Sequence, residues 1–459
     1  MLTSSGFKIK RGDLQSQMLK ELNVRPIVGD GFQGAPYFKV YRENLTRIRL
    51  PRFYGQSHYP SFTNDVSIDA YTRISIPFQG VLKVENAQVD ASNTVINTLR
   101  TKGGGVLSLP TGYGKTTVAL HVVSVIGVKT LIIVHKEFLM NQWIERIKQF
   151  IPSAKIGIIR QNTVEVIGKD IVICMLQSLS MKSYDKHVFN GFGLTVIDET
   201  HHICSRTFSS ALFNVTTKYI LGLSATPERK DGLTKVLNWF VGDICFKIER
   251  DVSNLDIKCE QLNFYCDEFV TTDIPLSVTG RISVPGIINI IANISVRNAL
   301  IVDRLKLFLD DGRKTIVLSD RRRHCEELLE RLNNEGIFDC GLYMGGMSEI
   351  ALKNSESKNI LLATYSLAQE GLDIPSLDTL ILATPKTDVV QACGRILRTG
   401  NVRKHQPYIL DIVDSFSILI NQGKKRSAFY KKSGFKIIKD VVEKEIVHVD
   451  ESFKTFSFI

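Results

Sequence analysis

The chain has 459 residues, 44% of them hydrophobic and 23% charged, and a formal net charge of +11. This length predicts two to four domains with ordinary buried cores. No apolar stretch approaches the roughly 20 residues that span a bilayer, and residues 1–13 lack the apolar region of a secretory signal. We therefore expect an intracellular protein with no membrane partner. The eight cysteines form no CxxC pair, which favours reduced thiols over a zinc site, with Cys259 and Cys266 left open as a half-site.

The positive charge lies in the two flanks of the chain. Residues 1–60 carry ten Lys/Arg and four Asp/Glu, and residues 421–439 carry seven Lys/Arg and no acid. The central region is therefore close to neutral. Basic flanks favour the phosphate backbone of a nucleic acid as partner. A tail that only keeps the protein in solution is the alternative.

The order of predicted elements indicates four parts. Residues 1–75 combine aromatics, scattered prolines and no clean period, which predicts a small, basic α+β cap. Strands and helices alternate over residues 76–246 and again over 297–425, which predicts two parallel sheets covered on both faces. Residues 247–296 are interpreted as a bridge or small inserted element, and residues 426–459 as a basic C-terminal extension. The predicted strands are 130–134, 170–174, 194–197, 220–224, 315–318, 360–363, 379–382 and 408–412.

Residues 107–116 read LSLPTGYGKT, with an apolar strand before them and a helical run after them. This is the context of a phosphate-binding loop, in which backbone amides surround the phosphates. Lys115 supplies a charge to the β- and γ-phosphates, and Thr116 supplies a hydroxyl for Mg²⁺. Leu109 stands where the general motif has its first glycine, which points away from small GTPases and toward helicases. The predicted ATP-binding residues are Pro110, Thr111, Gly112, Tyr113, Gly114, Lys115, Thr116 and Thr117.

Residues 195–202 read TVIDETHH, an apolar strand that ends in two carboxylates. Asp198 is predicted to hold Mg²⁺ through water, and Glu199 to orient and deprotonate the attacking water. Together with the phosphate loop, this pair predicts an ATPase that requires Mg²⁺.

Further motifs follow in a fixed order. They are LIIVHKEFLMNQW (131–143), VICMLQSLS (172–180), LSATPERKDG (223–232), ATYSLAQEGLDIPSLDTLI (363–381) and QACGRILRTG (391–400). With the loop and the DETH box, they resemble a superfamily 2 helicase of the DExH type. The resemblance is strongest to the XPB-like branch and to the transcript-release DNA helicases of poxviruses and other large DNA viruses. It covers roughly residues 75–425, and LPRFYG (50–55) resembles a signature of the viral members.

The resemblance implies two RecA-like domains with ATP between them. Arg398 is then the arginine finger, and Gln391 and Arg395 lie close by. Gln88 reads the adenine, with Asn86 as the alternative. The remaining implied nucleotide contacts, from the second domain, are Gly371 and Asp373.

The resemblance also implies residues that couple hydrolysis to movement, which are His201, Ser224, Ala225 and Thr226. The implied nucleic-acid contacts are His135, Gln177, Arg229, Lys230 and Thr364. The XPB branch has an Arg-Glu-Asp triplet where this chain has Arg229, Lys230 and Asp231. Since lysine replaces the acid, we expect this loop to grip phosphate and the protein to translocate on duplex rather than unwind it efficiently.

We therefore expect an ATP-dependent DNA helicase or translocase with 3′→5′ movement and a role in viral transcription, in elongation or transcript release. The expected partners are ATP, Mg²⁺, single-stranded or duplex DNA and an RNA polymerase complex. We expect a monomer, located in the host cytoplasm, at the virus factory, or in the virion. The alternatives are an RNA helicase of the DExH type and a scaffold with a weak ATPase in a transcription complex.

Overall fold

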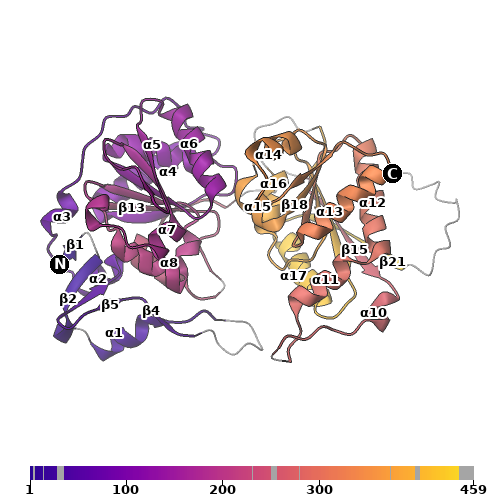
Figure 1. Cartoon of the computed structure of the whole chain (residues 1–459), viewed down its shortest axis with the longest axis horizontal. Coiled ribbons are helices and arrows are strands. Elements are labelled where there is room, and N and C mark those ends of the chain that lie inside the picture. Colours follow the sequence, from indigo (N-terminus) through magenta and orange to yellow (C-terminus); the bar gives the residue numbers. More distant parts are fainter. Residues whose placement is uncertain are drawn as a thin grey trace. The chain divides into compact units, whose positions relative to one another are not determined.

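The computed structural model describes residues 1–3, 6–13, 15–27, 36–229, 231–249, 256–278, 280–372, 374–397 and 404–443. For residues 186, 369–371 and 440–443 it describes the backbone alone. The chain divides into two compact units, Met1–Arg250 and Asp251–Ile459 (Figure 1). Each unit is described by itself.

The first unit begins with the α+β cap. Its main sheet is antiparallel with the order β1-β2-β6-β5, and one face of that sheet covers a small core formed by residues such as Phe7, Ile48 and Leu50. The elements are β1 (Leu2–Thr3), β2 (Gly6–Lys10), α1 (Ser16–Glu21), β3 (Asn23–Val24), β4 (Phe38–Lys39), β5 (Arg42–Glu43), β6 (Arg47–Leu50), α2 (Arg52–His58) and α3 (Val66–Asp69).

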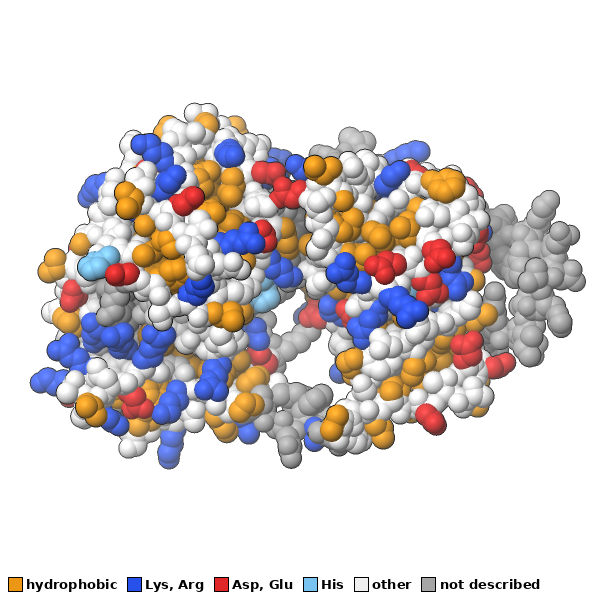
Figure 2. Space-filling model, in the orientation of Figure 1, with side chains coloured by type: hydrophobic (Ala, Val, Ile, Leu, Met, Phe, Trp, Pro, Cys, Tyr) orange, Lys and Arg blue, Asp and Glu red, His pale blue; other side chains and the backbone are white. Residues whose placement is uncertain are grey.

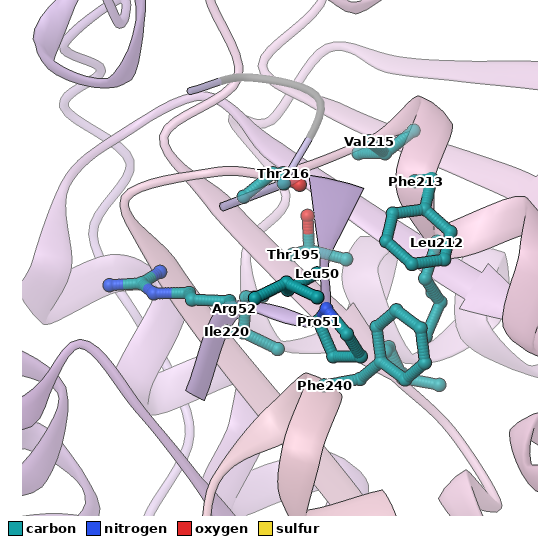
Figure 3. A pocket seen from close by; sticks show the side chains of 12 residues that line it. Leu50, Pro51, Arg52, Thr195, Leu212, Phe213, Val215, Thr216, Ile220 and Phe240 are labelled. Atoms are coloured by element: carbon teal, nitrogen blue, oxygen red, sulfur yellow. The ribbon is translucent and has the colours of Figure 1, made fainter. Parts of the chain in front are cut away.

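The LPRFYG run joins the cap to the rest of the first unit. Arg52 is buried, and its Nη1 donates to the carbonyl oxygens of Thr217 and Lys218, each at 2.8 Å. Figure 3 shows the Arg52 side chain beside a pocket of about 10 Å³ that residues of the cap and the neighbouring sheet line together. Burial lowers the pKa of Arg52 to about 10. The run is therefore the structural attachment of the cap, since a buried cation needs such partners.

An eight-stranded sheet forms the centre of the first unit, in the order β10-β9-β11-β8-β12-β13-β7-β14, and only the edge strand β10 is antiparallel. Its strands are β7 (Gly104–Ser108), β8 (Thr130–Val134), β9 (Ile156–Arg160), β10 (Thr163–Val164), β11 (Ile171–Met175), β12 (Leu194–Ile197), β13 (Tyr219–Ser224) and β14 (Ile244–Lys247). The helices are α4 (Gln88–Lys102), α5 (Lys115–Ile126), α6 (Glu137–Phe150), α7 (Leu176–Met181), α8 (Arg206–Ala211) and α9 (Thr234–Val241). Among them lie the short turns η2 (Lys186–Phe189), η3 (Thr200–Cys204) and η4 (Leu212–Asn214).

Both faces of this sheet are covered. Successive residues of a strand point to opposite faces, and in β8 Ile132 packs in the core with α4, α5 and α6, whereas Leu131 and Ile133 pack in the core with α7, α8 and α9. This explains why the strands are apolar throughout and do not alternate with polar residues.

The second unit contains a seven-stranded parallel sheet in the order β17-β18-β16-β19-β20-β15-β21. Its strands are β15 (Lys258–Tyr265), β16 (Thr315–Ser319), β17 (Cys340–Tyr343), β18 (Ile360–Thr364), β19 (Thr379–Leu382), β20 (Tyr408–Asp414) and β21 (Lys436–Glu443). The helices are α10 (Glu268–Thr271), α11 (Val284–Ala292), α12 (Ser295–Asp310), α13 (Arg322–Asn334), α14 (Glu349–Glu356), α15 (Tyr365–Gly371), α16 (Val390–Ile396) and α17 (Leu419–Lys432). The prediction of two parallel α/β domains with a small cap is confirmed.

The bridge and extension predicted at 247–296 and 426–459 differ from what the structure shows. Strand β15 lies inside the second sheet, hydrogen-bonded to β20 on one side and β21 on the other. Helices α11 and α12 pack in the core of the second unit. The described parts of both stretches belong to the second unit, because they supply strands β15 and β21 to its sheet and side chains of α11 to its core. Within the described residues, no single helix is long and apolar enough to cross a membrane, and α11 and α12 meet that test only as a pair bent by 66°.

One cation of the basic helix α17, Arg426, is not on the surface, where a contact with phosphate would require it to be. Lys424, Lys425, Lys431 and Lys432 are exposed, but Arg426 is fully buried. Its Nε donates to Asp411 Oδ1 at 2.8 Å and Oδ2 at 3.0 Å. Arg426 is therefore a core ion pair, and only the four lysines remain candidate phosphate contacts in this helix.

We expect Arg426→Gln to lower the free energy of unfolding by about 3–5 kcal/mol, because it leaves the buried Asp411 carboxylate without its cation. Lys425→Gln, one position earlier and exposed, should change it by less than about 0.5 kcal/mol. Denaturant unfolding of the two variants measures the difference. Equal stabilities would contradict a core role for Arg426.

Candidate active site

Three neighbouring parallel strands bring the motifs of the first unit together. The sheet order places β7, β13 and β12 side by side. The phosphate loop follows β7, Ser224 ends β13, and Asp198 follows β12. Since the carboxyl ends of parallel strands meet at one edge of a sheet, where ligands bind in α/β folds, residues more than 100 positions apart share one site.

The phosphate loop has a backbone that depends on glycine. Gly112 and Gly114 have φ values of 88° and 85°, in the left-handed region, where only glycine is free of strain. Helix α5 begins at Lys115, directly after Gly114. Lys115 Nζ donates to the Leu109 carbonyl at 3.2 Å and so spans the loop. The predicted residues from Pro110 to Thr117 therefore form a glycine-rich loop and the first turn of a helix, which is the backbone arrangement that suits an anion.

Gln88 makes direct contact with this loop. Its Nε2 donates to the Tyr113 carbonyl at 2.8 Å, and its Oε1 accepts from the Lys83 amide at 2.9 Å. A Cβ at position 114 would collide with the Gln88 amide. The side chain thus joins the upstream segment to the glycine turn. Its reading of adenine stays a prediction.

Asp198 is held by a tryptophan that the sequence analysis did not assign to the site. Trp143 Nε1 donates to Asp198 Oδ2 at 2.9 Å, and the Glu199 amide donates to Oδ1 at 3.0 Å. Burial, followed by the neighbouring Glu199 charge, raises the pKa of Asp198, while the Trp143 bond and the Lys115 charge oppose that rise. Asp198 therefore lies within the electrostatic influence of the phosphate-loop lysine.

Glu199 has an unusual backbone. Its φ of 45° and ψ of 55° lie in the left-handed region, where a residue other than glycine is strained, and such strain gathers at functional sites. Its Oε2 is buried and accepts no hydrogen bond from any residue that the structure describes, and His201 Nδ1 lies 3.5 Å away. A carboxylate with a vacant acceptor position is suited to take a proton from water.

The residues at this edge fit a Mg²⁺ ion. The ion prefers oxygen ligands and keeps several of its waters. Asp198 presents a carboxylate fixed by two donors, and Thr116 lies in the first turn of α5 beside Lys115. When bound, the ion would neutralise charge on the phosphates, while Asp198 and Thr116 would hold it.

We expect Trp143→Phe to raise the Mg²⁺ concentration needed for half-maximal ATP hydrolysis by about 10-fold or more. Phenylalanine keeps the buried ring but loses the N–H that orients Asp198, and the loss of such supporting bonds typically costs 10–100-fold in metal affinity. Trp239→Phe, the other tryptophan of the chain, is the matched control. Mg²⁺ titrations of ATPase activity compare the two, and overlapping curves would remove Trp143 from the site.

His201 and Ser224 connect the ATP edge to the following loop. His201 Nδ1 and Ser224 Oγ lie 3.2 Å apart, and Ser224 Oγ accepts from the Thr226 amide at 3.1 Å. Ala225 lies between these two residues in the chain. The His201 carbonyl accepts from Arg229 Nη1 at 2.6 Å. A continuous set of bonds therefore runs from beside Glu199 to the loop after β13.

The Arg229 side chain is held by hydrogen bonds to two neighbouring residues. Its Nε donates to Asp231 Oδ1 at 2.9 Å, and its Nη1 is held by the His201 carbonyl. Arg229 therefore ties the loop to the DETH segment. A contact between Arg229 and nucleic acid stays a prediction. Lys230, predicted for the same role, lies outside the described residues.

Two other predicted nucleic-acid contacts lie together at the ends of β8 and β11. Gln177 Nε2 donates to the His135 carbonyl, and the His135 ring lies 4.0 Å from the His202 ring, centroid to centroid. His202 lies 4.3 Å from His201 in the same way. His135 is buried, so it packs against the DETH segment. A direct contact between His135 and a nucleic-acid strand stays a prediction.

The second unit carries the other predicted residues. Arg395 is buried in α16, and its Nη1 donates to the Leu372 carbonyl at 2.6 Å, so it holds the chain directly after α15. Gln391 begins the same helix, Gly371 ends α15, and Thr364 ends β18. Asp373 and Arg398 lie outside the described residues. Their contribution to an ATP site shared with the first unit stays a prediction.

Comparison with known proteins identifies the family. The model of the type III restriction enzyme res subunit matches residues 81–229, and that of the helicase conserved C-terminal domain matches residues 298–400. A protein of Acanthamoeba polyphaga mimivirus, provisionally named an ATP-dependent RNA helicase, is 34% identical over 97% of this chain and 88% of its own. A provisionally named helicase of invertebrate iridescent virus 6 is 26% identical over 93% of this chain and 98% of its own.

Solved structures agree on the fold. A type ISP restriction-modification enzyme bound to DNA has a TM-score of 0.55 at 15% identity and covers 79% of this chain and 32% of that one. Dbp5 of S. cerevisiae, bound to RNA, has a TM-score of 0.53 at 13% identity and covers 77% and 89%. Both similarities concern the fold alone. The chain belongs to the superfamily 2 helicases, resembles those of large DNA viruses, and is a nucleic-acid-dependent ATPase.

Proposed function

We propose that the protein is an ATP-driven translocase that moves 3′→5′ on DNA and opens duplexes poorly. The observation that carries the proposal is the bonded path from the ATP edge into the loop after β13. His201 contacts Ser224, and its carbonyl holds Arg229, which is also paired with Asp231. An arginine fixed at both ends of its guanidinium transmits movement of the DETH segment but is not available to separate strands.

The nucleotide chemistry follows from the same edge. The phosphate loop would bind ATP, Asp198 and Thr116 would hold the Mg²⁺ ion, and Glu199 would take the proton of the attacking water. Arg398 would stabilise the negative charge that builds on the γ-phosphate in the transition state, because arginine's planar, cationic guanidinium suits phosphate oxygens. ATP hydrolysis and product release would then switch the protein between states that bind the nucleic-acid strand tightly and weakly.

The choice of DNA is supported by the relatives, which belong to viruses with DNA genomes. We infer a role in viral transcription, with the RNA polymerase complex as partner, a monomeric protein, and a location in the host cytoplasm, at the virus factory, or in the virion. The second candidate is an RNA helicase, which the provisional name of the mimivirus relative favours.

ATPase assays with duplex DNA, single-stranded DNA and the matching RNAs side by side test the substrate. We expect the largest stimulation from DNA. Displacement of a third strand from a DNA triplex measures translocation without unwinding, and a forked duplex measures unwinding. We expect rapid triplex displacement with 3′→5′ polarity and slow fork opening. Stronger stimulation by RNA would favour the second candidate, and rapid fork opening would contradict the role given to Arg229.

A further inference from the structure

The outward face of the cap sheet carries a dense set of cations. Strands β2, β6 and β5 lie side by side, and their register places Lys8 opposite Arg49, Lys10 opposite Arg47, and Arg42 opposite Arg49. Because side chains alternate between faces, these five residues share the face turned away from the cap core. We call this set the basic face. The intervening residues point into the core and are Phe7, Ile9, Ile48 and Leu50.

This arrangement is unfavourable for the cap alone. Like charges directly opposite each other destabilise a sheet, and here three such pairs adjoin. Glu43 is engaged by Lys39 at 3.0 Å and Arg11 at 3.5 Å, while neither Arg47 nor Arg49 has an ion pair within the described part of the chain. Burial, and then the charge of Arg49, lowers the pKa of Arg42. Repulsion between neighbouring cations is expected to persist in a folded protein where a bound anionic ligand compensates it.

The basic face is hollowed. An open depression of about 580 Å³ lies over it, and Figure 2 shows Lys and Arg side chains gathered in the part of the molecule where Figure 1 places β2 and β5. Its described lining contains four cations, one carboxylate (Glu43), an amide and a hydroxyl but no aromatic ring. Single-strand sites use aromatic rings to stack bases, whereas hydroxyl, amide and cationic groups grip phosphates without reading sequence. The lining residues are Lys8, Arg42, Glu43, Asn44, Thr46, Arg47 and Arg49.

The basic face is also anchored to the motor. Arg42 Nη1 donates to Asn214 Oδ1 at 2.9 Å, and its Nη2 donates to the Ser210 carbonyl at 2.8 Å. Its guanidinium lies 5.5 Å from the centre of the Phe213 ring. Residues 210–214 belong to α8 and η4 on the first RecA-like sheet. A polymer held on the basic face is therefore held by the same compact unit that carries the phosphate loop.

We propose that the basic face binds the sugar-phosphate backbone of duplex nucleic acid, as a second contact apart from the strand-binding ends of the RecA-like sheets. The contact is independent of ATP and of base sequence. It goes beyond the proposed translocation, because it concerns how the protein stays on a duplex and not how it moves.

The test is the salt dependence of binding to a labelled duplex, measured by fluorescence anisotropy without nucleotide. The variant combines Lys8→Gln, Arg47→Gln and Arg49→Gln and leaves the anchoring Arg42 intact. Each lost phosphate contact lowers the log–log salt slope by about 0.9. The loss of affinity between about 50 and 200 mM salt should therefore shrink by about 40-fold for three contacts.

The matched control removes the same charge from exposed lysines elsewhere in the first unit, as Lys102→Gln, Lys148→Gln and Lys155→Gln. We expect the control to change the slope by less than about one contact's worth and to unfold at the wild-type temperature. The basic-face variant should unfold at or above that temperature, because it loses the like-charge pairs, and both proteins should keep wild-type basal ATPase. For a single strand of the same length, the slope of the basic-face variant should change less than half as much. Equal slopes for variant and control would overturn the proposal, and so would an equal loss for single strand and duplex. Because no ATP is present, failure of the translocase proposal leaves this result unaffected.

Discussion

Replacing Lys115 with alanine is expected to reduce ATP turnover by at least about 10³-fold, because fixed charges on a transferring phosphoryl group are among the largest contributions to its catalysis. Lys115 begins α5 and its Nζ reaches under the loop to the Leu109 carbonyl at 3.2 Å. The ammonium is therefore already placed where phosphates would lie. Steady-state ATPase assays and equilibrium binding of a fluorescent ATP analogue measure the loss, which should appear in both.

Lys115→Arg separates charge from shape. It keeps the cation, but the larger planar guanidinium does not fit the space that a single ammonium spans between helix and loop. We expect it to remain inactive, whereas Lys148→Ala, an exposed lysine of α6, should retain wild-type turnover. Thermal unfolding should be near wild type in all three, since Lys115 is not a core residue. Substantial turnover by folded Lys115→Ala protein would refute the phosphate-loop assignment.

The motor motifs were predictable because each is contiguous and its chemistry is local. A glycine turn followed by Lys115 and a strand that ends in Asp198 and Glu199 show their function in a few residues. Parallel topology then brings these runs to one edge without further information. The role of Trp143 was not predictable in this way, because it lies 55 positions from Asp198 and only the tertiary fold turns its indole toward that carboxylate.

The predictions for strand β15 and for Arg426 were wrong for two different reasons. Strand β15 pairs with Tyr408 and the rest of β20, 150 residues later, and with β21, 178 residues later, so no neighbouring stretch of sequence marks it as part of a sheet. The position of Arg426 within α17 does indicate its burial. The buried residues of α17 are Leu419, Gly423, Arg426 and Tyr430, a spacing that follows one helical face. Arg426 lies on that apolar face, whereas the lysines of the helix lie off it, so Arg426 is the cation expected to form a buried ion pair.

Glu199→Gln is expected to separate ATP binding from hydrolysis. The substitution keeps the size of the side chain and the left-handed backbone but removes the base, and loss of a general base typically costs about 10²–10⁴-fold in rate. The phosphate loop and the Trp143–Asp198 bond are untouched, so affinity for ATP and Mg²⁺ should stay near wild type. Single-turnover hydrolysis and binding of the fluorescent analogue measure the two quantities separately.

The same variant tests the direction of coupling. His201 lies 3.5 Å from the Glu199 carboxylate and contacts Ser224, so a protein that holds unhydrolysed ATP should also hold its nucleic-acid strand. We expect Glu199→Gln with ATP to dissociate from DNA more slowly than the wild type, and to dissociate at the wild-type rate without nucleotide. Loss of ATP binding as complete as in Lys115→Ala would show that Glu199 supports the metal or the loop, and the division of roles between Asp198 and Glu199 would then be wrong.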